Sequence, residues 1–131
     1  MNVVARKCSL LRLLRARGGA TAAEFAAILP ALLAISLGIM EFGRLMWTKS
    51  ALNYAVEEAA RCAAINTSTC GTQAQVQSYA ASHAGQTFAV SVFTLSTPAC
   101  GTQVSATYPF QFVVPLVDYS VTLQASYCYP T

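Results

Sequence analysis

The chain has 131 residues, which is room for one modest domain, and 55% of them are hydrophobic while 10% are charged. Five of its eight basic residues lie before Gly18, whereas after Gly19 three basic residues stand against five acidic ones. The basic cluster runs directly into an apolar segment and no basic residue follows Arg61, so this distribution argues against a nucleic-acid partner.

The first 19 residues form a basic leader that ends in Gly18-Gly19, and no acidic residue occurs before Glu24. A basic flank on one side of a membrane span holds that side in the cytoplasm. We therefore expect the leader inside the cell and the part of the chain beyond the apolar segment outside it. The basic residues of the leader are Arg6, Lys7, Arg12, Arg15 and Arg17.

The stretch from Phe25 to Met40 carries no charge, and the run from Ala20 to Met40 contains one charged residue, Glu24. Such a run approaches the roughly 20 residues that a helix needs to cross a bilayer. An ionisable residue at the edge of a membrane segment is costly, so Glu24 is a candidate functional residue. Small side chains recur at helical spacing and would let another helix approach closely, although an alanine-rich segment also produces such a stripe by chance. The residues of this small-residue stripe are Ala23, Ala27, Ala31, Ala34 and Gly38.

The helical pattern continues beyond the apolar segment, because apolar residues return every three, four or seven positions and charged residues take the others. We expect one helix over 20–64 that spans a membrane in 20–41 and is amphipathic after it. A second helix is expected from Gln73 to His83, ended by Gly85. The apolar face of the amphipathic part consists of Phe42, Leu45, Met46, Leu52, Ala55, Val56, Ala59 and Ala63.

After Gly85 the apolar residues alternate with polar ones, which is typical of half-buried strands. The clearest alternation covers 119–129, and residues 87–95 and 103–108 are expected as two more strands. A loop bounded by Pro109 and Pro115 follows the second of these. Three strands with one apolar face need a cover, which the amphipathic helix supplies. The predicted fold is α+β, with a long helix packed on a small antiparallel sheet of roughly three strands.

Four of the five cysteines, Cys62, Cys70, Cys100 and Cys128, lie in the part expected outside the cell. Four cysteines in a small exported domain form two disulfides in one of three connectivities, with four free thiols as the alternative. The short separation favours Cys62–Cys70, which leaves Cys100–Cys128. One observation is against this pairing. Cys128 lies on the polar face of its strand, whereas Cys100 would fall on the same face of the sheet as the apolar residues of the next strand, unless Gly101 forms a bulge.

No arrangement of catalytic, metal-binding or cofactor-binding residues stands out. His83 is the single histidine, without an acid or a cysteine at catalytic spacing, and the chain has no CxxC motif and no glycine-rich phosphate loop. Glu57 and Glu58 are adjacent, so they do not face each other on a helix. Asn66-Thr67-Ser68 matches a glycosylation acceptor, a common and weak motif. We expect no enzyme, no metal and no cofactor, and we interpret Trp47 as an interfacial anchor where the helix leaves the bilayer.

The sequence around Gly19 resembles a known signature. An ordinary secretory signal is cut after its apolar region, but here the Gly-Gly precedes it, so a cut there leaves the helix on the mature protein with Glu24 as its fifth residue. Gly19, Glu24 and the apolar helix together resemble the type IV prepilin signature. More narrowly, "ATAAEFAAILPALLAISLGIMEFGRLMW" and the residues up to Ala64 resemble the TadE-like proteins, small pseudopilins of the tight-adherence (Flp) pilus system. Tyr108-Pro109 and the final "VTLQASY" resemble the same family less specifically.

This resemblance implies a pilin-like minor pilin or pseudopilin that takes part in pilus assembly or initiation. It implies that a prepilin-type peptidase removes leader 1–19 by cutting between Gly19 and Ala20. The mature protein then crosses the inner membrane once, with 65–131 as an extracytoplasmic globular domain. Its partners would be the peptidase, other pilin subunits, the pilus assembly platform and the membrane. Glu24 would pair with the α-ammonium of a neighbouring subunit, or, alternatively, reach the headgroup region or stabilise its own helix.

Two other functions remain open from the sequence. One is a membrane-anchored extracytoplasmic binding or adhesion module that never enters a filament. The other is a secreted soluble domain whose signal is cut near Ser36 or Gly38 by ordinary signal peptidase.

Overall fold

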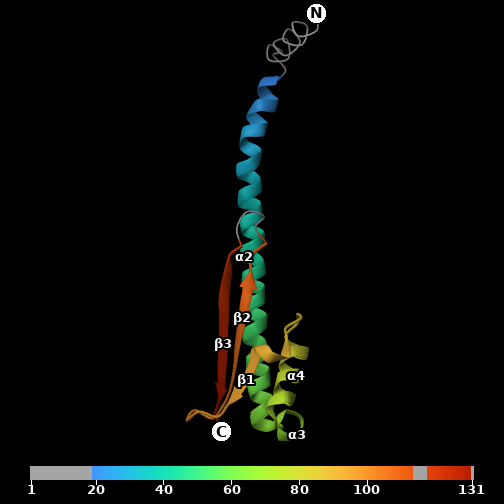
Figure 1. The fold of residues 1–131 in the computed structure, drawn as a ribbon, viewed down its shortest axis with the longest axis vertical. Helices are drawn as coiled ribbons and strands as arrows, with labels where there is room; N and C mark the ends of the chain where they lie inside the picture. Colours follow the sequence, from blue (N-terminus) through green and yellow to red (C-terminus); the bar gives the residue numbers. More distant parts are fainter. Residues whose placement is uncertain (1–18, 114–117, 131) are drawn as a thin grey trace, which may run out of the picture. The chain divides into compact units, whose positions relative to one another are not determined.

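The longest element of the chain is helix α2, Ala20–Ile65. The computed structural model describes residues 19–113 and 118–130, which divide into two units, one ending at Met40 and the other beginning at Glu41. The predicted α+β fold, a long amino-terminal helix with a three-stranded antiparallel sheet, is confirmed (Figure 1). The other elements are α3 (Thr67–Cys70), α4 (Gln73–His83), the short 3-10 helix η2 (Val90–Val92), β1 (Phe93–Ser96), β2 (Thr102–Gln111) and β3 (Ser120–Tyr129).

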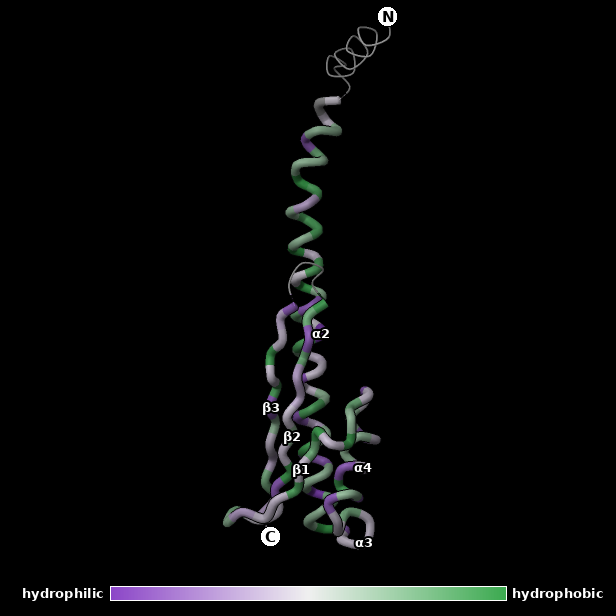
Figure 2. Tube along the Cα trace, viewed as in Figure 1, coloured by the Kyte–Doolittle hydropathy of each residue, from purple (hydrophilic) through white to green (hydrophobic). Residues whose placement is uncertain are grey.

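In the first unit, α2 runs through the apolar segment without a break, although Pro30 lies inside it. Alanine and leucine are among the best helix formers, and they make up much of this segment. Its large apolar side chains are uncovered by the described chain, as Phe25, Ile28 and Ile39 show with exposed fractions of 63%, 64% and 69%. Figure 2 colours most residues of this part of the helix as hydrophobic. The helix is long and apolar enough to cross a membrane.

In the second unit, one face of α2 is buried against the sheet and α4. The predicted apolar face is confirmed at Leu52, Ala55, Val56, Ala59 and Ala63, which are all buried. Alanine is the commonest residue of this face, and its small side chain brings the helix backbone close to the sheet.

The prediction of a buried face is wrong at its first positions, because Phe42 and Met46 are exposed. In this turn of α2 the side chain that contacts the sheet is that of Arg44. Its guanidinium carbon lies 5.4 Å from the ring centre of Phe110, a residue of β2. Leu45 on the same turn is half-buried against the core.

The sheet has the strand order β1-β2-β3, with every neighbouring pair antiparallel. The predicted strand over 119–129 is confirmed as β3. The second strand extends further than predicted, because Pro109 lies inside β2, opposite Thr122, and begins no loop. Pairing with β1 ends at Ala106, so the edge of β2 beyond that point is free of β1 and tolerates a residue without an N–H.

The first predicted strand, 87–95, is wrong over most of its length. Only β1 is extended, and η2 precedes it. The N–H of Val92 donates to the carbonyl of Ala89 (3.1 Å), so the chain closes a turn where a strand would offer this group to a neighbour. The turn lets the ring of Phe88 meet Phe93 and Tyr108 edge-on, with ring centres 6.1 Å and 5.0 Å apart.

The second predicted helix is confirmed as α4, with the same limits. Thr72 begins it with a reciprocal cap, since its hydroxyl accepts from the Gln75 N–H (3.4 Å) and the Gln75 side chain accepts from the Thr72 N–H (3.1 Å). Gly85 follows its end with a φ of +70°, a left-handed conformation that glycine adopts at little cost. The helix buries Val76 and Ala80 in a core centred on the fully buried ring of Phe93.

Candidate functional site

The predicted cleavage position lies directly before the first residue of α2. Gly19 is exposed, and a Cβ built there would meet no atom within 4 Å. Its backbone adjoins Ala20, where the helix begins. Among the residues that the structure describes, no neighbouring atom therefore requires a glycine at position 19.

Glu24 lies in the second turn of α2 and is exposed. Within residues 19–113 and 118–130, no hydrogen bond or salt bridge reaches its carboxylate; the one salt bridge there joins Arg44 to Glu41 at 2.7 Å. Glu24 is thus a carboxylate at the start of an apolar helix, with no counter-charge supplied by the described chain.

The small-residue stripe also lies on the uncovered part of α2. Residues at spacings of three and four share one face of a helix, so Ala27, Ala31, Ala34 and Gly38 line up along it. A Cβ built at Gly38 would meet nothing within 4 Å. The described fold gives no internal reason for a glycine here, whereas a closely packed neighbouring helix would.

These residues fall within one stretch that matches a known protein family. Residues 19–61 match the family model described as TadE-like protein. This segment is TadE-like. The match begins at Gly19, includes Glu24 and the stripe, and confirms the resemblance read from the sequence. It implies a protein associated with the tight-adherence pilus. No curated protein and no solved structure matches the chain.

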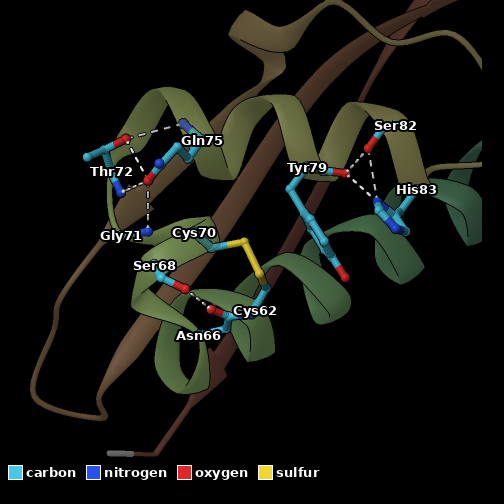
Figure 3. Close-up of a disulfide and its surroundings, with 10 residues drawn as sticks. All are labelled: Cys62, Asn66, Ser68, Cys70, Gly71, Thr72, Gln75, Tyr79, Ser82 and His83. Atoms are coloured by element: carbon cyan, nitrogen blue, oxygen red, sulfur yellow. Dashed lines mark hydrogen bonds between the residues drawn. A yellow bond between two sulfur atoms is a disulfide. The ribbon is translucent and has the colours of Figure 1, made fainter.

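Downstream of the TadE-like segment, two disulfides staple the second unit. Cys62 near the end of α2 bonds to Cys70 at the end of α3, with their Cα atoms 5.7 Å apart (Figure 3). Cys100 bonds to Cys128 of β3, with Cα atoms 6.4 Å apart. These are the two pairs that the sequence favours.

The sequence suggests that Cys100 and Cys128 would lie on opposite faces of the sheet, but this conflict does not arise. Cys100 lies in the turn before β2, outside the strand alternation, and the turn is closed by the Gly101 N–H donating to the Pro98 carbonyl (3.0 Å). Gly101 has a φ of +127°, which lets the chain enter β2 while Cys100 points to β3.

The two edges of the sheet are covered by side chains from the helices, a feature that sequence reasoning missed. At the β1 edge, the carbonyl of Phe93 accepts from the amide groups of Gln73 (3.1 Å) and Gln77 (2.9 Å), and the Leu95 N–H donates to Gln73 Oε1 (2.7 Å). Glutamine near the start of a helix carries no signal for such a contact in the sequence.

At the β3 edge the covering group is Lys49. Along an antiparallel pair of strands, residue pairs whose backbones are hydrogen-bonded to each other alternate with pairs whose backbone groups point outward. The Phe112 N–H donates to the Tyr119 carbonyl (3.1 Å), and counting along β3 from this bonded pair puts the backbone groups of Gln124 on the outer edge, pointing away from β2. The ammonium of Lys49 donates to the Gln124 carbonyl. A lysine at an exposed edge is a common protection against pairing with another chain.

The single histidine has a local structural role. His83, on the last turn of α4, stacks on Tyr79 with ring centres 4.0 Å apart, and its Nδ1 lies 2.9 Å from the Tyr79 carbonyl (Figure 3). In the part of the chain that the structure describes, no three His, Cys, Asp or Glu side chains gather in a way that could hold a metal ion.

Proposed function

We propose that this chain is a minor pilin or pseudopilin that takes part in the assembly or initiation of a tight-adherence pilus. It is made as an inner-membrane precursor whose residues 1–19 face the cytoplasm, and a prepilin-type peptidase cuts it between Gly19 and Ala20. Helix residues 20–41 span the membrane, and 65–131 form the globular domain outside. Its work is done through contacts with other pilin subunits and the assembly platform, without catalysis.

One observation carries the proposal. The TadE-like segment places a lone carboxylate, Glu24, at the start of a helix whose apolar side chains the described chain leaves uncovered. Uncovered apolar surface on this scale requires lipid or other helices around it. A membrane supplies the first environment and a bundle of pilin helices supplies the second.

In such a bundle Glu24 has a specific partner. Cleavage before Ala20 creates an α-ammonium, which needs a counter-charge once helices pack in an apolar environment. The carboxylate lies four residues along, about 6 Å of helix rise, so it would pair with the ammonium of an axially staggered neighbour. A wrong stagger leaves both charges unpaired, so the pair favours one register.

The small-residue stripe would form the helix contact itself. Its alanine and glycine residues are small enough to let two helix backbones approach closely. Because lipid is as apolar as the helix surface, such close packing is a main source of helix association in a membrane. The two disulfides agree with a domain outside the cytoplasm, where an oxidising environment maintains them.

The test is the amino-terminal sequence of the protein from the membrane fraction and from sheared pili. We expect a chain that begins at Ala20 in both. An uncut chain in the membrane, absent from pili, would support a membrane-anchored adhesion module in its place. A chain that lacks Phe25 to Ile35 would instead indicate a secreted domain cut by ordinary signal peptidase.

A further inference from the structure

The second unit contains a hollow of about 730 Å³ between α2, the β2 edge and the segment before η2. Its walls include Gly43, Arg44 and Trp47 from α2, with Pro109 and Phe110 from β2. This volume lies within the range of natural small-ligand sites. In the sequence, Gly43 comes three residues after Met40, the last residue of the uncharged apolar run.

The electrostatics of the hollow rest on an ion pair at its edge. Arg44 is the one charged residue among those that line the hollow, and its partner Glu41 lies beside the lining, where the Glu41 carboxylate also accepts from the Val113 N–H (3.4 Å). Nη1 of Arg44 donates to both carboxylate oxygens of Glu41 (2.7 Å and 2.9 Å), and its guanidinium lies over the ring of Phe110. These contacts fix the guanidinium, while 46% of the side chain remains exposed. Among the described residues, no hydrogen bond uses its Nη2 or Nε.

The rim of the hollow is apolar and uncovered. Trp47, the one tryptophan of the chain, is 67% exposed, and Val113 is 71% exposed. Tryptophan with its ring exposed beside a basic residue is typical of positions at a membrane surface, where the ring meets the headgroup region and the cation meets phosphate.

We propose that this hollow binds the headgroup of an anionic phospholipid. The free N–H groups of Arg44 hold the phosphodiester, because a guanidinium offers two parallel donors that match phosphate oxygens. Trp47 and Val113 contact the glycerol region and the upper acyl chains. The proposal rests on the proposed membrane-spanning helix, since that span puts Gly43 and the residues after it at the outer headgroup level.

An added polypeptide strand is the other occupant that this edge of β2 could take, and the residues argue against it. Strand addition depends on a row of backbone donors and acceptors. Pro109 has no N–H and lies in the middle of the edge that β1 leaves free. The one exposed charge of the lining also matches an anionic headgroup, whereas a strand needs no charge there.

The experiment uses the full-length chain in maltoside micelles, which contain no phosphate, with fluorescence of Trp47 as the readout. Brominated phosphatidylglycerol is added at increasing mole fraction. We expect saturable quenching whose half-saturation rises about fivefold in Arg44→Gln, the effect of one basic residue at an anionic surface. Arg61→Gln removes the same charge from the same helix outside the hollow, and its half-saturation should equal that of the wild type.

Several results would overturn the assignment. Quenching that rises without saturation, equally in wild type and Arg44→Gln, would mean that Trp47 only touches the micelle. Inorganic phosphate that relieves the quenching as effectively as unbrominated phosphatidylglycerol does would indicate a simple anion site. A photoreactive residue in place of Val113 that captures polypeptide instead of lipid in intact membranes would assign the hollow to a protein partner.

Two further measurements distinguish a failure of the lipid site from a failure of the proposed function. Arg44→Lys retains the charge and loses the paired donors, so it should bind more weakly than wild type while its thermal unfolding stays unchanged. Carbonate extraction of membranes tests the span itself. A chain that resists extraction yet shows no saturable quenching contradicts the lipid site alone, whereas a chain that carbonate releases contradicts the proposed function.

Discussion

Oε1 of Gln73 accepts a hydrogen bond from the backbone N–H of Leu95 at 2.7 Å. The same amide donates to the carbonyl of Phe93 at 3.1 Å, so one side chain satisfies both an N–H and a C=O at the outer edge of β1. A glutamine side chain thereby takes the place of the next strand. An open strand edge offers its unpaired backbone groups to another chain and so invites uncontrolled pairing.

Substitution Gln73→Ala should therefore destabilise the second unit and expose the β1 edge. We expect a loss of about 0.5–1.5 kcal/mol in the free energy of unfolding, the net worth of an ordinary hydrogen bond, because the bond between Leu95 and Gln73 is exposed and water can reach the freed N–H. Gln77→Ala is the matched control, since the Phe93 carbonyl still has Gln73. Thermal unfolding and sedimentation velocity measure the two effects. Equal stability and no added self-association in Gln73→Ala would contradict the edge-protection role.

Processing depends on Gly19 in the proposed function. A prepilin-type site needs a residue without a side chain before the cut, so Gly19→Leu should leave the full-length precursor in the membrane. The fold offers no other reason for a defect, because a Cβ at Gly19 meets nothing within 4 Å. Intact-mass measurement decides the matter, and the same mature mass from wild type and variant would refute the cleavage assignment.

Glu24→Ala should be inserted and processed but should fail to support piliation. The α-ammonium of the neighbouring subunit loses its counter-charge on assembly, whereas membrane insertion does not need the carboxylate. Glu57→Ala removes another exposed carboxylate further along α2 and should leave piliation unchanged. Pilus counts by electron microscopy are the measurement. Normal piliation with Glu24→Ala would exclude the register role.

The small-residue stripe can be tested at Gly38. Gly38→Leu should leave the monomer folded, because the position is open in the described chain, and should weaken association with other pilin helices by blocking close approach. Leu37→Ile, one residue off the stripe, is the control. Cysteine crosslinking between subunits in membranes reports the association. Unchanged crosslinking in Gly38→Leu would show that the stripe arises from composition alone.

The disulfides should contribute unequally to stability. The Cys100–Cys128 bridge closes a separation of 28 residues and Cys62–Cys70 one of 8, and a longer loop loses more entropy when it is closed in the unfolded chain. Serine replacement of both cysteines should cost roughly 2–4 kcal/mol per bridge, with the larger loss for Cys100 and Cys128. Denaturant unfolding measures the losses. Non-reducing peptide mapping checks the pairing, and a Cys62–Cys100 peptide would disprove it.

Much of the fold follows from local sequence. The limits of α4 are readable because capping by Thr72 and the left-handed Gly85 act within a few residues. The strand β3 follows from its strict alternation, and the apolar run before Met40 indicates a membrane helix from composition. Prediction from the sequence fails where contacts with residues far away in the chain determine the local structure. Residues 87–92 have strand-like composition, but a strand needs a neighbour, and here Phe88 packs on Phe93 and Tyr108 while the backbone turns.

The elements of the proposed assembly site can be read directly from the sequence, because Gly19, Glu24 and the apolar helix form one continuous stretch that no folding is needed to bring together. The contacts that protect the edges of the sheet in the second unit arise only when the chain folds. Tertiary structure placed Gln73 on β1 and Lys49 on β3, and it formed the hollow around Arg44 from segments far apart in the chain. Such contacts depend on how a helix is rotated and positioned against a sheet. That choice is made by the packing of the whole core, which no local pattern records.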